Sequence, residues 1–518
     1  MKHDHISFKE YTMDNLSLPS NIADLIPRDN MAHVVHEMVE RIPMETFLAY
    51  YKGGGASAYH PKMMTKILLY AYTQKMYHGR EIARQLEVHL PLMWLSGFQK
   101  PDFRSINRFR SERMKDLIDD LFREMITLLV ADGYVKMEDY FVDGTKIEAN
   151  ANRYTFVWRK SAEKYQEKLQ ANVDRLIAQI EVIVEEEKAE DIDIDPSPAF
   201  TSEEIRKKTE EWEKRLEAEP DNQPLKKAIK KMKEDYLPRS EKYEHQLHVC
   251  GDRNSYSKTD VDATFMRLKE DHMRNGQLKP AYNVQVGSSG QFILGYSLHQ
   301  RPGDTRCLLP HLETVREKYG VEPERLIADA AYGSEENYVK LEEKHISALI
   351  KYHTYEKENT RKVKKNPHHQ QNWTYVEEED VWICANGKKL VRTGTSKQTT
   401  ESGYTSVTRH YQCHECEGCP FRSACTTSKY GRTTQWNPIY HEQKQKARER
   451  LESEEGQARY RQRQTDIESV FGQIKQNRGF RRFVLRGLQK VSIEWGLVCA
   501  AHNLLKKAAR DKQLSLVA

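Results

Sequence analysis

The sequence has no apolar run that approaches the ~18 residues of a membrane-spanning helix, which excludes a membrane protein. It also lacks a strong net charge. The 82 basic and 77 acidic residues leave +5 on 518 residues, so the total alone does not indicate nucleic-acid binding. Residues 1–15 lack the apolar core of a secretory signal, and we expect a cytoplasmic protein. The seven Trp, 27 Tyr and 15 Phe exclude a fully disordered chain.

Cysteine is scarce, and disulfides are disfavoured in the cytoplasm. Four of the eight cysteines nevertheless lie within thirteen residues: Cys413, Cys416, Cys419 and Cys425. Thiolates at this tight spacing suit a structural Zn²⁺ site, in which Cys384 or His414 is a possible substitute ligand. An iron–sulfur cluster and plain reduced thiols are the alternatives. No partner for a nucleophilic cysteine lies nearby.

The first part of the chain has a helical pattern. Apolar residues recur at helical spacing over residues 31–130, and the short helix predicted over residues 105–113 is rich in arginine. Short helices with turns between them resemble a helix-turn-helix module, which makes Arg104, Arg108 and Arg110 candidates for DNA contact. A small helical bundle with a solvated basic face is the alternative.

Short apolar runs then indicate an α/β core. Residues 138–149 predict a strand pair that turns at Gly144-Thr145 and places Asp143 near the end of its first strand. Residues 281–296 predict a hairpin, and residues 325–333 a buried strand with a polar end. The pattern also predicts helices over 308–319 and after Ser334, and a strand over 346–351.

Two insertions interrupt this core. Near-heptad apolar spacing predicts an antiparallel helical hairpin over residues 158–247, broken by an acidic segment at 191–198. Residues 353–445 look irregular and contain the cysteine cluster. Residues 446–478 predict one long polar helix, and 491–509 a final helix.

This order of elements matches a ribonuclease-H-like core, in which acidic residues of the first strand, the fourth strand and a late helix converge. The candidates are Asp143, Asp329 and Glu468. Two divalent cations held by such carboxylates would activate the attacking oxygen and stabilise the leaving oxygen. On a helix, Glu468 would share a face with Gly472 and Lys475. Taken singly, each residue fits a turn aspartate or a surface glutamate better, but the three together in this order favour metal-binding carboxylates.

Residues 475–490 concentrate the basic charge that the total conceals, because they contain six basic residues and no acidic one. Arginine forks suit phosphate oxygens, so DNA contact is the preferred interpretation over a solvated loop. The candidate DNA-binding residues here are Lys475, Arg478, Arg481, Arg482 and Arg486.

Three segments resemble bacterial insertion-sequence DDE transposases. These are the motifs that begin at Phe141, Ala328 and Ile467, and the segments around residues 59–110 and 264–285 also resemble parts of those proteins. Two departures stand out. Ala331 replaces a usual glycine, and Tyr460 and Arg463 are not at the commonest offsets before Glu468, which leaves the roles of those two residues open.

The resemblance implies a DDE transposase that cuts element ends by phosphodiester hydrolysis and joins them to target DNA by transesterification. It implies Mg²⁺ (or Mn²⁺), double-stranded DNA as partner, a homodimer on DNA, association with the nucleoid, and no other small-molecule cofactor. A structure-specific nuclease on the same core and an inactive DNA-binding remnant are the alternatives. The expected organisation is a helical DNA-binding domain (1–130), first core strands (135–157), a helical-hairpin insertion (158–250), continued core (255–352), a Cys-rich, zinc-binding insertion (353–445) and C-terminal core helices with the basic segment (446–518).

Overall fold

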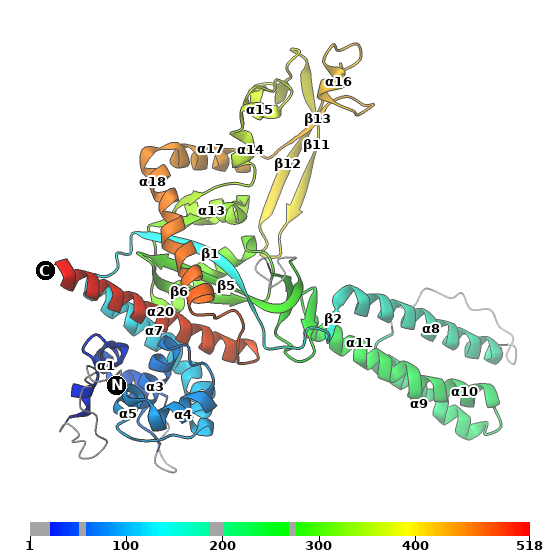
Figure 1. Cartoon of the computed structure of the whole chain (residues 1–518). Coiled ribbons are helices and arrows are strands. Elements are labelled where there is room, and N and C mark those ends of the chain that lie inside the picture. The colour runs from blue at the N-terminus through cyan, green and yellow to red at the C-terminus, as the bar shows by residue number, and fades with distance from the viewer. Residues whose placement is uncertain (1–20, 51–57, 186–199, 269–275, 518) are drawn as a thin grey trace, which may run out of the picture.

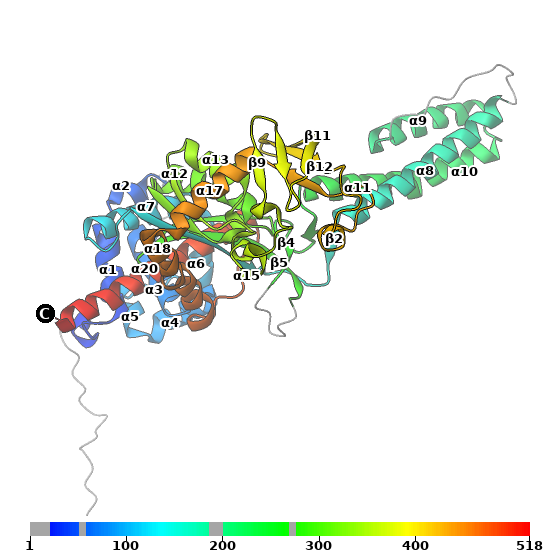
Figure 2. The ribbon, with the colours of Figure 1, turned by 90° about the horizontal axis from the view of Figure 1, so that it is seen from above.

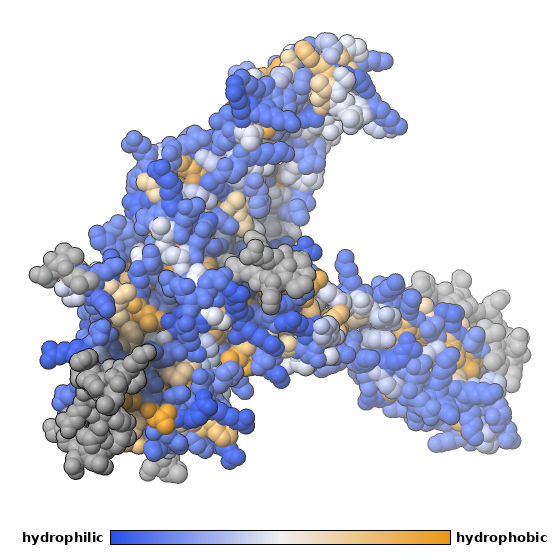
Figure 3. Space-filling model, viewed as in Figure 1, coloured by the Kyte–Doolittle hydropathy of each residue, from blue (hydrophilic) through white to orange (hydrophobic). Residues whose placement is uncertain are grey.

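The computed structural model describes residues 21–50, 58–185, 200–268 and 276–517. The helices near the N-terminus lie beside the C-terminal helix, and a central sheet adjoins them (Figure 1). A second sheet rises from this core, and a helical arm projects from its side, as Figure 2 also shows. Hydrophilic residues dominate the visible face in Figure 3, where hydrophobic ones form small groups. Within the described ranges, no helix has both the length and the apolar character needed to cross a membrane.

The N-terminal helices pack around α20 (Leu488–Val517), which is the last helix of the chain. Nearly every residue of α3 (Pro61–Thr73) is buried, because α1 and α20 both pack against it. The prediction of helical structure over residues 31–130 is confirmed. The helices are α1 (Met31–Arg41), α2 (Met44–Leu48), α3, α4 (Gly79–Val88), α5 (Leu90–Leu95), α6 (Phe103–Arg108) and α7 (Met114–Ala131).

The central sheet has the strand order β4–β5–β1–β7–β8, and β6 also pairs with β5. Strand β1 is antiparallel to β5 and parallel to β7, which in turn is parallel to β8. Helices α12 (Leu308–Tyr319) and α20 pack on β6, and α13 (Glu335–Glu343) packs on β8. The strands are β1 (Asp139–Glu148), β4 (Thr264–Arg267), β5 (Leu278–Ser289), β6 (Phe292–His299), β7 (Arg325–Ala328) and β8 (Ser347–Ile350).

The prediction of a strand pair over residues 138–149 is wrong, because β1 is one continuous strand with Asp143 in its middle. Strand β5 pairs with β1 from Phe141 to Glu148, so the expected turn residues stay extended. Gly144 serves close packing here. A Cβ at this position would collide with the Gln285 amide and the Asp304 carboxylate.

The helical arm contains more elements than the predicted hairpin. Its two ends, α8 (Arg159–Glu185) and α11 (Leu237–Cys250), pack together, and β2 (Phe156–Trp158) pairs with β3 (Ser255–Ser257) at the base. Helices α9 (Ser202–Ala218) and α10 (Gln223–Lys231) lie between them in sequence. The arm has its own hydrophobic core around Val173, Trp212 and Met232. The acidic break at 191–198 lies outside the described residues.

Residues 353–445 are not irregular, since they form an antiparallel five-stranded sheet of order β13–β12–β11–β10–β9. Most side chains of β11 are exposed and polar, so its residues lack the alternation of apolar and polar side chains that indicates a strand. Short helices α14 (Tyr355–Glu358), α15 (Arg361–Lys364) and α16 (Arg422–Cys425) accompany the sheet. The strands are β9 (Thr374–Val376), β10 (Val381–Ile383), β11 (Lys389–Thr399), β12 (Thr405–Gln412) and β13 (Thr433–Trp436).

A buried carboxylate, Glu335 at the start of α13, attaches this sheet to the core. It accepts hydrogen bonds from the hydroxyls of Tyr404 (2.8 Å) and Ser406 (2.5 Å) and from the Asn437 amide (2.6 Å). Ser334 caps α13, as predicted from the sequence. The second sheet is therefore held against the core by charge-assisted hydrogen bonds.

The polar helix predicted over residues 446–478 is interrupted. Helix α17 (Pro438–Glu452) ends before Ser453, whose hydroxyl caps α18 (Glu454–Arg463) by accepting from the Gly456 amide. A π-helical turn, Gln464–Glu468, follows directly, and then α19 (Ser469–Gly472) and a second π-helical turn, Gln473–Asn477. The final helix, α20, is longer than the predicted range.

Glu494 of α20 is a buried carboxylate that fastens the basic segment. Its oxygens accept from the backbone amides of Val484 (3.0 Å) and Leu485 (2.9 Å). Burial raises the pKa of Glu494 from an ordinary 4.5 to about 7. A raised carboxyl pKa contributes stability that is full at low pH and is lost as the pH rises through the folded-state value.

We therefore predict that Glu494→Gln flattens the pH dependence of stability. Between about pH 5 and about pH 8, the free energy of unfolding of the wild type should fall by on the order of 2 kcal/mol more than that of Glu494→Gln. Urea unfolding at several pH values measures this difference. Glu45→Gln, at an exposed position of α2, is the control. Parallel pH profiles for the wild type and Glu494→Gln would contradict the prediction.

Candidate active site

The parallel pairing of β1 with β7 brings two of the candidate carboxylates together. The last paired residues are Val142 and Ala328, so Asp143 and Asp329 are the next residues on neighbouring strands. Both line a cleft of about 670 Å³, and Glu468 lines the same cleft. Two further acidic residues, Glu148 and Asp304, also line it, and the sequence did not single them out.

Asp143 is partly buried beside a second carboxylate, Asp329. One of its oxygens accepts from the Gly144 amide (2.8 Å). Burial, together with the nearby carboxylate of Asp329, raises the pKa of Asp143 to about 7. A carboxyl group in this position gains from any cation that enters the cleft, because a cation favours its ionised form.

Asp329 begins the turn that follows β7. Its side chain accepts from the Ala331 amide (2.8 Å), which closes the short helical turn Ala330–Tyr332. Ala331 is the residue that replaces a glycine of the family motif, and its carbonyl accepts from the Thr305 hydroxyl (2.6 Å). The turn therefore forms with alanine at this position.

Asp466, a carboxylate that the sequence did not single out, fixes the turn that carries Glu468. Asp466 is buried and accepts from the Ser288 hydroxyl (2.9 Å) and from the amides of Gly290 (2.9 Å) and Gln291 (3.1 Å). These bonds pin the π-helical turn to the β5–β6 connection. The Glu468 side chain stays 46% exposed, so it remains accessible from the cleft.

Arg463 connects two of the cleft carboxylates. Its guanidinium donates to Glu468 (2.7 Å) and lies 3.7 Å from an Asp143 oxygen. Residues five apart on an α-helix point about 140° away from each other. The π-helical turn at Gln464–Glu468 reduces this angle, because its i→i+5 hydrogen bonding widens the helix and lowers the rotation per residue. The unusual offset of Arg463 is thereby accommodated, and the Tyr460 ring lies 5.9 Å from its guanidinium.

The basic segment (residues 475–490) runs beside the end of β1, where Glu148 and Arg482 form an isolated parallel β-bridge. Lys475 and Arg481 line the cleft, while Arg481, Arg482 and Arg486 are exposed. The phenylalanines between them, Phe480 and Phe483, are buried in the core. The segment thus turns its apolar residues inward and most of its arginines outward.

Two of the arginines that the sequence suggested for DNA contact donate hydrogen bonds within the protein instead. Arg478 is partly buried and donates to the carbonyls of Tyr72 (2.8 Å) and Thr73 (2.5 Å). Arg110 is 2% exposed and donates to the Tyr77 carbonyl (2.8 Å). Both guanidiniums are therefore engaged inside the protein. Arg104 and Arg108 remain exposed on α6.

The cysteine cluster does not form a metal site as it stands. Cys413, Cys416, Cys419, Cys425 and Cys384 line one small cavity, and all five are free thiols. Burial and the neighbouring Cys416 thiol raise the pKa of Cys413 to about 12. Across the described ranges, no group of three His, Cys, Asp or Glu side chains is arranged to hold a metal ion, and this includes the carboxylate cleft, where Arg463 lies between Glu468 and Asp143. The predicted zinc site is therefore not supported.

Comparison with known families gives two matches. Residues 383–508 match the family Transposase DDE domain, and residues 20–112 match Transposase domain (DUF772). No curated protein matches the chain. The first match includes Glu468 and the basic segment, and the second covers helices α1 to α6.

Both matched models describe domains of transposases, which act on DNA. Within that class, both matches confirm the resemblance to insertion-sequence DDE transposases. Asp143 and Asp329 lie outside the matched ranges, and they join Glu468 through the geometry of the cleft.

The two neighbouring carboxylates of the π-helical turn should respond differently to removal. Asp466→Ala leaves three donors without their acceptor and should lower the free energy of unfolding by about 2–4 kcal/mol. Glu468→Ala removes one half-exposed ion pair and should change it by less than about 1 kcal/mol. Urea denaturation measures both. Equal losses in the two variants would refute the assignment of Asp466 as the anchor.

Proposed function

We propose that this protein is a DNA transposase that cuts the ends of an insertion sequence and joins them to target DNA. The observation that carries the proposal is the convergence of Asp143, Asp329 and Glu468 on one cleft bordered by Lys475 and Arg481. Phosphodiester cleavage needs carboxylates to hold cations and basic groups to receive the DNA backbone, and this cleft offers both.

We assign the core to the ribonuclease-H-like class. The order β6–β5–β1–β7–β8, with the first three strands antiparallel and the last three parallel, supports this assignment. We further assign the N-terminal helices to recognition of the element ends. The helical arm and the second sheet are assigned as insertions into the core, and the active form as a homodimer that pairs two DNA ends.

The cleft suits divalent cations by its chemistry, since its acidic ligands are hard oxygen donors of the kind that Mg²⁺ prefers. Bound there, two such ions would activate the attacking oxygen and stabilise the leaving one. Burial, and next the charge of Asp329, raise the pKa of Asp143, and a bound cation would offset both effects. Arg463 now spans Glu468 and Asp143, so it must move aside before these two carboxylates can share a cation.

Loss of any of the three carboxylates should abolish the reaction. In Asp143→Asn, Asp329→Asn and Glu468→Gln, we predict a fall of more than about 100-fold in Mg²⁺-dependent cleavage of DNA that carries both flanks of the gene. Affinity for the same DNA should remain within a few-fold. Glu167→Gln on the helical arm is the matched control. Cleavage at the wild-type rate by the three variants would rule out the proposed site.

A structure-specific nuclease on the same fold is the second candidate, because the cleft geometry serves cutting as well as joining. Paired end oligonucleotides with a target plasmid separate the two candidates. The transposase joins the freed 3′ ends to the plasmid, whereas a nuclease releases fragments without joined products. An inactive DNA-binding remnant would do neither.

The exposed arginines beside the cleft should contribute to the salt dependence of DNA binding. If Arg481 contacts one phosphate, Arg481→Ala should reduce the slope of log affinity against log salt by about 0.9. Fluorescence anisotropy over a salt series measures the slope. Lys168→Ala, an exposed basic residue of α8, should leave it unchanged. An unchanged slope for Arg481→Ala would remove this residue from the DNA interface.

A further inference from the structure

The carboxylate cleft has a basic end as well as an acidic one. Besides Arg463, its basic lining residues are Lys146, Arg153, Lys279, Lys475 and Arg481. The last two belong to the basic segment, whereas the first three come from β1, the chain that follows it, and β5. The sequence did not single out these three, because only the fold brings them together.

The cleft opens along one edge of β1. Strand β7 pairs with this edge as far as Val142, and the basic segment pairs with it at Glu148. There the Glu148 amide donates to the Arg481 carbonyl (3.1 Å), and the Phe483 amide donates to the Glu148 carbonyl (2.9 Å). Between these two pairings the edge is part of the cleft lining, with Gly144, Thr145 and Lys146.

Glu148 gathers three cations at the basic end of the cleft. Its carboxylate lies 3.3 Å from the Arg153 guanidinium, 3.4 Å from the Lys279 ammonium group and 3.9 Å from the Arg482 guanidinium. Glu148 and Lys279 are buried, whereas the side chains of Arg153 and Arg482 are 46% and 47% exposed. One carboxylate thus faces three cations, and this end of the cleft carries excess positive charge.

Two of these cations are committed to nothing else. Among the described residues, Glu148 is the one hydrogen-bond or ion-pair partner of the Arg153 and Lys279 side chains. Arg482, by contrast, also donates to two backbone carbonyls of the chain that follows β1, at 3.3 Å each. Arg153 and Lys279 therefore keep N–H donors for a ligand in the cleft.

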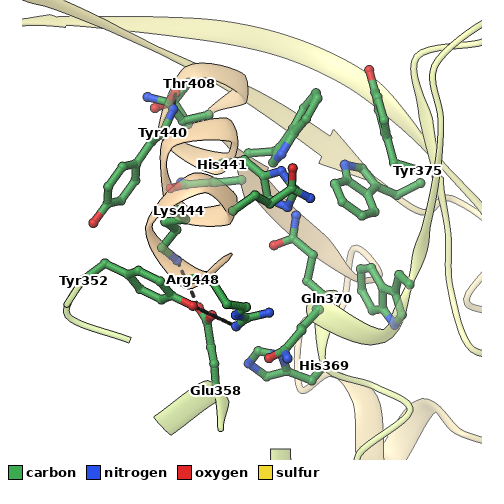
Figure 4. A pocket seen from close by; sticks show the side chains of 17 residues that line it. Tyr352, Glu358, His369, Gln370, Tyr375, Thr408, Tyr440, His441, Lys444 and Arg448 are labelled. Carbon is green, nitrogen blue, oxygen red and sulfur yellow. Dashed lines mark hydrogen bonds and ion pairs between the residues drawn. The ribbon is translucent and has the colours of Figure 1, made fainter. Parts of the chain in front are cut away.

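A separate cavity, of about 590 Å³, shows a tighter arrangement of the same kind. It lies between α17 and the five-stranded sheet and shares no lining residue with the cleft. There Lys444 and Arg448 point toward Glu358, and each lies 2.9 Å from it (Figure 4). Charge-assisted N–H···O bonds are about 2.7–2.9 Å long, so the pairing at Glu358 is close and that at Glu148 is loose.

A backbone phosphate of DNA suits the basic end of the cleft. Guanidinium and ammonium groups bind phosphate oxygens through charge-assisted hydrogen bonds, and one arginine can form two of them. The acidic end has the opposite chemistry, because its carboxylates repel a phosphate until cations face them. A DNA strand in the cleft therefore finds donors for a phosphate at the basic end, away from the bond that is cut.

We propose that the basic end is a phosphate subsite for the DNA strand that is cut. Arg153 and Lys279 hold one backbone phosphate, and Glu148 orients both cations. From Asp143 to Glu148 an extended strand covers about 16 Å. One strand of B-DNA carries a phosphate every ~3.4 Å of helix axis, so the held phosphate lies within about five nucleotides of the cut bond. The inference rests on the proposed function, because that function places DNA cleavage in this cleft.

The test neutralises one phosphate at a time. The cut position is first mapped on DNA that carries both flanks of the gene. A single uncharged methylphosphonate is then placed at each position within about five nucleotides of the cut bond. Binding to the full chain is measured by fluorescence anisotropy without Mg²⁺. We expect that one position weakens binding to the wild type about 5-fold, and that this penalty disappears in Arg153→Gln.

Three further variants complete the test. Arg153→Lys keeps the charge and should keep the penalty at the same position. Lys279→Gln should lose it, after urea unfolding has shown that this variant is folded. Arg316→Gln on α12 is the matched control, because Arg316 is 49% exposed and pairs with one glutamate, Glu313, outside the cleft. It should leave the penalty at every position unchanged.

Loss of the penalty at one position in Arg153→Gln supports the subsite. Penalties that stay the same at all positions in Arg153→Gln would overturn it, and cleavage by the wild type would then leave the proposed function intact. Equal weakening at all positions would also overturn it, because it would indicate a general effect of charge. Absence of cleavage by the wild type would refute the proposed function, and the subsite with it.

Discussion

The burial of neighbouring carboxylates in one cleft is the constraint on which the rest of this structure depends. Asp143, Asp329, Asp304 and Glu468 line the same space, and burial together with the Asp329 charge already raises the pKa of Asp143. Like charges in a partly desolvated site are costly unless cations face them. Arg463 supplies one such cation from within the protein. The proposed metal ions would supply the others, and the lysine and arginine residues beside the cleft would face the phosphates of the proposed DNA substrate.

The elements around the cleft keep the carboxylates in place against this repulsion. The β1–β7 register fixes Asp143 beside Asp329, and buried Asp466 fastens the helix that carries Glu468. Glu494 holds the basic segment through the backbone of Val484 and Leu485. The helical arm and the second sheet are inserted between core elements without breaking the central sheet, so large additions leave the cleft intact.

The sequence identified the three carboxylates because they lie in local motifs beside apolar runs or on an amphipathic helix. It misplaced Asp143 at a strand end, since Gly144-Thr145 has turn chemistry that pairing with β5 overrides. The second sheet was missed because β11 is polar and exposed. Asp466 and the burial of Arg110 depend on partners distant in sequence, the β5–β6 turn and Tyr77. No local pattern reports such contacts.

The most direct measurement of the central claim is to locate the metal. Replacing Mg²⁺ with Fe²⁺ on the DNA-bound protein and adding peroxide generates hydroxyl radicals that cut the backbone close to the ion. The account predicts cuts near Asp143, near Asp329 and between Arg463 and Lys475, all suppressed by excess Mg²⁺. Cuts confined to the cysteine cavity or to the helical arm, with none at these positions, would contradict it.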